Sequence, residues 1–232
     1  MKYGICNLSI VPVKSEASDK SEQISQLLYG ETFIILKEKT KWIKIKLCFD
    51  NYIGWINNKQ FEIINEQQFN LLEKDPQIYS YDLVEFIKNA NHELIAIPIG
   101  SKLNGLNVFN HNYDGSKISG IQEKSKIITT ALRFLNSPYL WGGRTPFGID
   151  CSGFTQMVYK LNGHKLERDS HLQAKQGSSL SFIEESEPGD LAFFDNKEGE
   201  IVHVGIIMDD NHIIHASGKV RIDRIDQTGI YN

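Results

Sequence analysis

The chain has 232 residues, of which 41% are hydrophobic and 23% are charged, and its formal net charge is −4. This length suits one large domain or two to three small ones, and the composition is ordinary for a globular protein. The sequence has no basic stripe of the kind that binds nucleic acid, and no apolar run approaches the roughly 18 residues of a membrane span. We therefore expect neither a nucleic-acid partner nor a membrane span.

Residues 1–68 contain short apolar or alternating runs that are separated by turn residues. The clearest runs lie at residues 10–13, 31–37, 42–47 and 52–56. Five or so short strands in this length predict a small β-barrel. Trp42 and Trp55 either fill the core of this barrel or contact a ligand, and core filling is the favoured interpretation. Tyr52 follows a polar turn, where an aromatic side chain can line a groove.

Residues 69–120 carry weaker signals. Residues 82–88 are interpreted as a short helix, and residues 94–100 as a strand in which Pro98 indicates a sheet edge. Asn104-Gly105 and Asp114-Gly115 are turn dipeptides. These signals favour a second, more diverged β-rich unit.

Residues 121–232 have helical patterns first and strand patterns later, which predicts an α+β arrangement. Apolar residues recur at helical spacing within residues 123–135, and Pro138 ends that helix. A second helix begins near Cys151, because Phe154, Val158 and Leu161 recur at the same spacing.

Cys151 lies where a glycine-rich loop turns into this second helix. Unpaired N–H groups and the positive end of the helix dipole lie at such a position, so we expect a lowered thiol pKa and a reactive thiolate. An isolated cysteine is more often a small buried hydrophobe. The flanking Asp150 and Ser152, together with the glycine-rich approach, favour a nucleophile instead.

Residues 201–208 are an apolar run that contains His203, and residues 212–217 follow a turn at 209–211 as a second strand. Together they predict a β-hairpin. A single histidine in an apolar strand is usually a hydrogen-bonded core residue. If the connecting loop has three residues, 209–211, His203 and His215 share one face of the sheet as diagonal neighbours. If the loop has two residues, they point to opposite faces. A catalytic base for the thiol therefore requires the three-residue loop.

Six motifs in this half of the chain, taken in order, resemble the NlpC family of papain-like cysteine peptidases. They are YLWGG at 139–143, DCSGF at 150–154, RDS at 168–170, PGDL at 188–191, HVGI at 203–206 and HAS at 215–217. The resemblance covers roughly residues 121–232. It implies Cys151 as the nucleophile, His203 as the base and His215 as the polar residue that orients His203. It also implies that Tyr139 lies beside the oxyanion site.

The pattern of Leu27 to Glu31, Trp42 and Gly54-Trp55-Ile56 resembles bacterial SH3-like domains, which commonly precede NlpC-type catalytic domains. The predicted fold class is therefore an α+β papain-like catalytic domain preceded by small all-β SH3-like barrel domains. The expected boundaries are 1–68 for an SH3-like barrel, 69–120 for a second, diverged SH3-like unit or linker, and 121–232 for the peptidase domain.

The family resemblance also implies a substrate, since NlpC-type enzymes cleave peptidoglycan stem peptides. Members with SH3-like domains include those that cut between γ-D-glutamate and diaminopimelate or lysine. In the subset that acts on short recycled peptides, the SH3-like domain closes one end of the cleft and a free L-alanine amine is required. Asp150 is the implied partner of that ammonium. The implied substrate-binding residues are Asp150, Ser152, Arg168, Asp169, Ser170, Tyr52 and Glu22.

The first residues show no basic region followed by a long apolar core, so no signal peptide is visible. The three cysteines, Cys6, Cys48 and Cys151, fit neither a disulfide framework nor a zinc site. We therefore expect a cytoplasmic protein that needs no cofactor or metal and that recycles peptide fragments. Two alternatives stay open: an amidase or acyltransferase on the same scaffold, and a non-catalytic protein that binds wall peptides.

Overall fold

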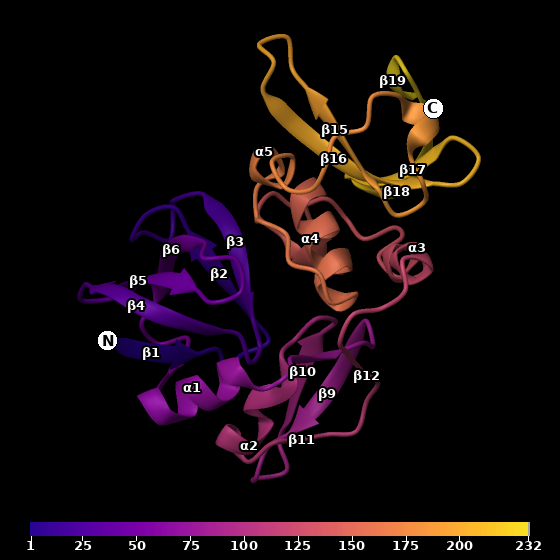
Figure 1. The fold of residues 1–232 in the computed structure, drawn as a ribbon. Helices are drawn as coiled ribbons and strands as arrows, with labels where there is room; N and C mark the ends of the chain where they lie inside the picture. The colour runs from indigo at the N-terminus through magenta and orange to yellow at the C-terminus, as the bar shows by residue number, and fades with distance from the viewer. Residues whose placement is uncertain (232) are drawn as a thin grey trace. The chain divides into compact units, whose positions relative to one another are not determined.

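The structure is a computed structural model, and it describes residues 1–231. The chain divides into two compact units, Met1–Gly120 and Ile121–Asn232. Figure 1 draws the first unit in indigo to magenta and the second in pink to yellow.

A seven-stranded antiparallel sheet forms most of the first 64 residues. Its strands, in order across the sheet, are β3 (Gln23–Leu28), β2 (Ile10–Lys14), β6 (Ile53–Asn57), β5 (Trp42–Leu47), β4 (Thr32–Glu38), β1 (Lys2–Ile5) and β7 (Glu62–Ile64). Val13, Phe33 and Ile45 belong to the core that this sheet encloses. Trp42 and Trp55 are buried, so their interpretation as core residues is confirmed.

The rest of the first unit begins with α1 (Glu66–Lys74), which starts at a capping box formed by Asn65 and Gln68. The elements that follow are β8 (Ile78–Ser80), β9 (Val84–Lys88), β10 (Leu94–Pro98), the 3-10 turn η1 (Leu103–Gly105), α2 (Leu106–Phe109), β11 (Asn112–Tyr113) and β12 (Lys117–Ser119). β9 pairs with β10 and β11, and β8 pairs with β12. The interpretation of residues 69–120 as a second SH3-like unit stays a prediction.

The helix predicted for residues 82–88 is wrong, because β9 occupies most of that segment. The strand pairs along its whole length with β10, and Ile87 in it is fully buried. Asn89 fixes the connecting turn, since its side-chain oxygen accepts hydrogen bonds from the N–H groups of Asn91 and Glu93. Pairing with a neighbouring strand therefore decides the structure of a segment whose apolar spacing fits either element.

The second unit places helices before a sheet, as Figure 1 shows. The helical elements are α3 (Ser125–Leu132), α4 (Cys151–Leu161), α5 (Ser170–Gln173) and the 3-10 turn η2 (Ile183–Glu185), and a small hairpin joins β13 (Arg144–Thr145) to β14 (Gly148–Ile149). The sheet is antiparallel, in the order β15 (Leu191–Asp195), β16 (Ile201–Met208), β17 (His212–Ser217), β18 (Lys219–Asp226) and β19 (Gly229–Tyr231). This order of elements confirms the predicted α+β arrangement.

Helix α4 is the central element of the second unit. It packs against α3, β16 and β17, and every residue in it except Tyr159 is buried. Such complete burial gives its first residue, Cys151, a rigid support next to the sheet. Within residues 1–231, no helix has both the length and the apolar character needed to cross a membrane.

Candidate active site

The N-terminus of α4 is held by the carboxylate of Asp150. One carboxylate oxygen accepts a hydrogen bond from the N–H of Gly153 at 2.6 Å, and the other accepts one from the N–H of Gly142 at 2.8 Å. Asp150 is thus both the N-cap of α4 and a link to the glycine-rich loop. A Cβ atom on residue 153 would lie 2.2 Å from the carbonyl oxygen of Gly143, so only glycine fits this close approach.

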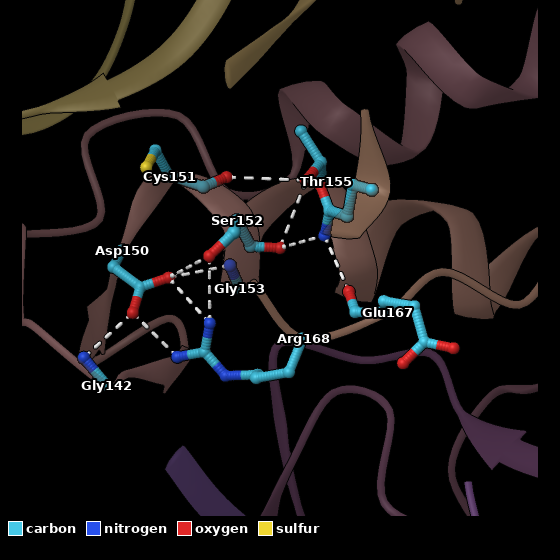
Figure 2. Close-up of polar contacts among 9 residues, drawn as sticks. Gly142, Asp150, Cys151, Ser152, Gly153, Thr155, Glu167 and Arg168 are labelled. Carbon is cyan, nitrogen blue, oxygen red and sulfur yellow. Dashed lines mark hydrogen bonds and ion pairs between the residues drawn. The ribbon is translucent and has the colours of Figure 1, made fainter. Parts of the chain in front are cut away.

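Arg168 makes a buried, bidentate ion pair with Asp150, as Figure 2 shows. Its Nη2 lies 2.6 Å from Oδ2 of Asp150, and its Nη1 lies 3.0 Å from both Oδ1 of Asp150 and Oγ of Ser152. The side chains of Arg168 and Asp150 are 1% and 8% exposed. The guanidinium and the carboxylate therefore neutralise each other inside the unit, and the two parallel hydrogen bonds have the geometry of a bidentate arginine–carboxylate pair.

This ion pair bears on Asp150 as the implied partner of the substrate ammonium. Arg168 and two backbone N–H groups already pair with the Asp150 carboxylate in the free protein, so the carboxylate keeps partners when no ammonium is bound. Ser152 is also part of this network, since its hydroxyl accepts from Arg168 and lies 3.3 Å from Asp150.

Gln173 connects α5 to α4, a role that the sequence analysis missed. Its Nε2 donates to the carbonyl oxygens of Ser152 and Glu167 at 2.9 and 2.8 Å, and its Oε1 accepts from Thr155 at 2.7 Å. A glutamine in a four-residue helix gives no sequence signal of this kind. Figure 2 shows that the sulfur of Cys151 points away from these polar contacts. The network thus supports the start of α4 from behind and leaves the thiol on the other side.

The two histidines of the β16–β17 hairpin lie on the same face of the sheet. Gly205 pairs with His215 and Met208 with His212, so the loop has three residues, as the shared face requires. Nε2 of His203 lies 2.7 Å from Nδ1 of His215, and the two rings meet edge to face. The predicted juxtaposition of His203 and His215 is therefore confirmed.

The sulfur of Cys151 lies against the strand that carries His203. The backbone N–H groups of Val204 and Ser152 both hydrogen-bond it, and Val204 follows His203 directly in β16. Because α4 also packs on β16 and β17, the start of the helix lies beside the strands that carry the histidine pair. A thiol and an imidazole base on such neighbouring elements fit nucleophilic catalysis.

The expected lowering of the Cys151 pKa is wrong for the free protein. Burial, and next the negative charge of Asp150, raise the pKa of this thiol, although hydrogen bonds from the N–H groups of Val204 and Ser152 act in the opposite direction. Burial and then the neighbouring His215 lower the pKa of His203 to about 4. At neutral pH the pair therefore consists of a thiol and a neutral imidazole, which is a base with a free lone pair.

Tyr139 belongs to the same electrostatic environment. Burial, followed by the charges of Cys151 and Asp150, raises the pKa of its phenol to about 12. The phenol therefore keeps its proton near neutral pH and can donate a hydrogen bond. Its backbone N–H donates to the carbonyl oxygen of Gly218 at 2.9 Å, which ties it to the turn between β17 and β18.

Asp223 is a second residue that the sequence analysis missed. It is buried in β18, and its Oδ2 lies 2.9 Å from Nε2 of His215. Arg221 donates to its other oxygen at 2.7 Å. Strand alternation places Arg221 and Asp223 on one face, but only the pairing of β17 with β18 brings them to the histidine.

The roles of all the candidate residues stay predictions, and four of these residues lie outside the contacts described so far. Asp169 precedes α5 and is half-buried, as is Ser170, its first residue. In the first unit, Tyr52 is half-buried and Glu22 is exposed. Among residues 1–231, no group of three or more His, Cys, Asp or Glu side chains is arranged to hold a metal ion. All three cysteines are free thiols.

Two family models match the chain. The model described as the NlpC/P60 family matches residues 136–232, and the model described as the bacterial dipeptidyl-peptidase Sh3 domain matches residues 15–61. A Bacillus subtilis (strain 168) protein named gamma-D-glutamyl-L-lysine dipeptidyl-peptidase is 30% identical over 217 residues, which cover 83% of this chain and 71% of the relative. The chain belongs to the NlpC/P60 family of cysteine peptidases. The predicted family and its hydrolase class are thus confirmed.

Other NlpC/P60 relatives share less of the chain or only its fold. A Listeria seeligeri protein named probable endopeptidase p60 is 40% identical over 104 residues, which are 44% of this chain and 20% of that protein. The crystal structure of an NlpC/P60 family protein from Bacillus cereus ATCC 10987 matches with a TM-score of 0.84 and 20% identity, covering 98% of this chain and 95% of that one. These matches confirm the fold class, a papain-like NlpC/P60 domain after an SH3-like all-β region.

Proposed function

We propose that this NlpC/P60 chain is an endopeptidase that hydrolyses the bond between γ-D-glutamate and the diamino acid of peptidoglycan-derived stem peptides. Its substrates are peptides with a free N-terminal L-alanine, recycled in the cytoplasm. The extent of the similarity carries this proposal. The dipeptidyl-peptidase relative matches 83% of the chain, whereas the p60 relative matches only 44%. The similarity to the dipeptidyl-peptidase relative therefore extends into the first unit. The family model that matches residues 15–61 of that unit is also described as a dipeptidyl-peptidase Sh3 domain.

The chemistry begins when the thiol of Cys151 attacks the γ-carbonyl carbon of D-glutamate and passes its proton to His203 in the same step. The backbone N–H of Cys151 and the phenol of Tyr139 stabilise the oxyanion. The C–N bond then breaks as His203 returns the proton to the leaving amine of the diamino acid. Water attacks the resulting thioester, with His203 again as the base, and releases L-Ala-γ-D-Glu and the free thiol. His215 holds the imidazole of His203 in place throughout.

The raised pKa of Cys151 and the lowered pKa of His203 fit a mechanism in which attack and proton transfer occur together. A preformed thiolate–imidazolium pair is disfavoured in the free protein because both groups are buried. Substrate binding excludes water and brings the carbonyl next to the thiol. A base is then needed only at the moment of attack, and the neutral imidazole of His203 acts as that base.

Recognition of the free amine gains a charge-assisted hydrogen bond that acetylation removes. Such bonds contribute about 1.5–3 kcal/mol, which corresponds to roughly ten- to a hundredfold in catalytic efficiency. No larger penalty follows from Asp150, because Arg168 remains its partner whether or not the amine is charged. We therefore expect an N-acetylated peptide to be cut more slowly by about that factor.

Mass spectrometry of reaction products tests the proposal. Purified protein is incubated with L-Ala-γ-D-Glu-meso-diaminopimelate, with the corresponding L-lysine peptide and with the N-acetylated form of each. We expect L-Ala-γ-D-Glu and the free diamino acid from the unmodified peptides, and no turnover with Cys151→Ala. Release of L-alanine, transfer of the acyl group to an added amine, or equal rates on free and acetylated peptides would each contradict it. Cell fractionation tests the cytoplasmic location.

A further inference from the structure

The two histidines are the first members of a row of four hydrogen-bonded side chains. From the α4 side of the sheet, His203 contacts His215, His215 contacts Asp223, and Asp223 contacts Arg221. The three distances are 2.7, 2.9 and 2.7 Å. The side chain of Asp223 is 8% exposed, so the middle of this row of side chains is shielded from water. The proposed function assigns roles to the two histidines and none to Asp223.

The direction of each hydrogen bond follows from the charge of Asp223. Burial by itself raises the pKa of this carboxyl group, but the hydrogen bonds from His215 and Arg221 hold it below its usual value. An ionised carboxylate only accepts hydrogen bonds, so Nε2 of His215 must carry a proton. In the neutral ring Nδ1 of His215 is then an acceptor, and Nε2 of His203 must donate to it. The only lone pair left on His203 is that of Nδ1.

We propose that Asp223 is a positioning residue that fixes the tautomers of both imidazoles and so leaves Nδ1 of His203 free as the base. This inference rests on the proposed role of His203. It adds a residue from a third strand, β18, to the residues on which turnover depends. Asp223 acts through His215 and touches neither the thiol nor the peptide.

Arg221 makes the proposal sharply testable, because it determines how an amide in place of the carboxylate would orient. In Asp223→Asn, the guanidinium of Arg221 attracts the amide oxygen, and the amide NH₂ group then faces Nε2 of His215. His215 must accept there and must donate from Nδ1. Nε2 of His203 then accepts, its Nδ1 becomes protonated, and the ring has no lone pair for the thiol. The same exchange of acid for amide in a serine-protease triad costs about 10⁴ in kcat through the wrong tautomer.

The first measurement uses the unaltered protein. Histidine labelled with ¹⁵N is examined by two-bond ¹⁵N–¹H correlation near neutral pH, and the ring signals are assigned from the spectra of His203→Gln and His215→Gln. We expect both rings protonated at Nε2 and unprotonated at Nδ1. A proton on Nδ1 of either ring overturns the proposal, and this result needs neither the peptide substrate nor a folded Asp223 variant.

The second measurement compares variants. We expect Asp223→Asn to lower kcat by about a hundredfold or more with KM within about twofold, and to move the proton of His215 to Nδ1. Alkylation of Cys151 by iodoacetamide, followed on its own proteolytic peptide, should slow by at least about tenfold. The double variant Asp223→Asn/Arg221→Met should have a kcat at least about tenfold higher than that of Asp223→Asn alone. Without Arg221, the amide can rotate so that its oxygen accepts from His215. Asp226→Asn removes an exposed charge from the same strand and should change none of these quantities.

The outcomes separate this inference from the proposed substrate. The proposed role of Asp223 is overturned if Asp223→Asn leaves kcat and the alkylation rate unchanged. It is also overturned if kcat and the alkylation rate both fall while the two histidines keep their wild-type tautomers. Failure of the peptide to be cleaved would instead contradict the proposed function. The tautomers and the alkylation rate would still decide the role of Asp223.

Discussion

Removal of the guanidinium of Arg168 tests whether the buried ion pair holds the start of α4. In Arg168→Met, the carboxylate of Asp150 keeps the N–H groups of Gly142 and Gly153 as partners but loses two charge-assisted bonds of 2.6 and 3.0 Å. Breaking a buried pair by removing one partner costs about 3–5 kcal/mol. Because two backbone donors remain, we expect the lower end, about 3 kcal/mol.

Hydrogen–deuterium exchange of the α4 amides measures this loss within the second unit. A loss of about 3 kcal/mol corresponds to exchange that is roughly a hundredfold faster in the peptide spanning residues 151–161. Arg168→Met combined with Asp150→Asn should regain at least about 1 kcal/mol, because the orphaned charge is removed while an oxygen remains to cap Gly153. Lys124→Met is the matched control. It breaks the surface pairs of Lys124 with Glu187 and Asp190 and should cost less than about 1 kcal/mol.

Two results would refute this reasoning. One is an exchange rate in Arg168→Met that equals that of the Lys124→Met control. The other is a double variant no more stable than Arg168→Met, which would mean that the buried carboxylate does not need its cation. Either result would show that the ion pair does not support the start of α4.

Three further predictions concern catalysis. Tyr139→Phe should lower kcat by about a hundredfold with little change in KM, because one oxyanion donor is lost; wild-type kcat would exclude that role. Gly205→Ala should lower kcat/KM by at least about tenfold, since its Cβ would lie 2.9 Å from Cβ of His215 and 2.6 Å from Cδ1 of Ile213; an unimpaired enzyme would show that the His215 position tolerates displacement. The pH profile of kcat/KM should stay flat down to about pH 5 and fall only as His203, with its pKa of about 4, becomes protonated. An acid limb near pH 6.5 would contradict this and indicate an unperturbed histidine.

Local features of the site could be predicted from the sequence. Asp150 caps the helix that begins at the next residue, so the neighbouring residues were enough to place Cys151 at the start of a helix. The apolar pattern allows a hairpin loop of either two or three residues. The structure has three, with Asp210 and Asn211 both in the left-handed region at φ 56° and 57°. Aspartate and asparagine tolerate that conformation better than other non-glycine residues, so the loop sequence itself held the missing signal.

Features that depend on distant pairing could not be predicted. Asp150 and Arg168 are 18 residues apart, and nothing in either motif shows that the two charges are buried together. Asp223 reaches His215 only because β17 pairs with β18 in one register, which apolar periodicity does not define for a strand rich in charges. The strand at Val84–Lys88 has apolar spacing that also fits a helix, and the partner strand β10 that decides between the two lies outside the segment. The raised pKa of Cys151 could not be predicted either, because it comes first from burial of the thiol, which depends on the tertiary fold.

Covalent capture of Cys151 by a substrate mimic tests most directly whether this thiol attacks the γ-glutamyl carbonyl. The mimic is L-Ala-D-Glu with a chloromethyl ketone at the γ-carboxyl carbon, and its α-linked isomer is the control. We predict a single adduct, located on Cys151 by peptide mass spectrometry, that forms at least about tenfold faster with the γ-linked reagent and is suppressed by excess L-Ala-γ-D-Glu-meso-diaminopimelate. Labelling of Cys6 or Cys48 instead, or equal rates with the two isomers, would contradict the assignment of the nucleophile and of the bond.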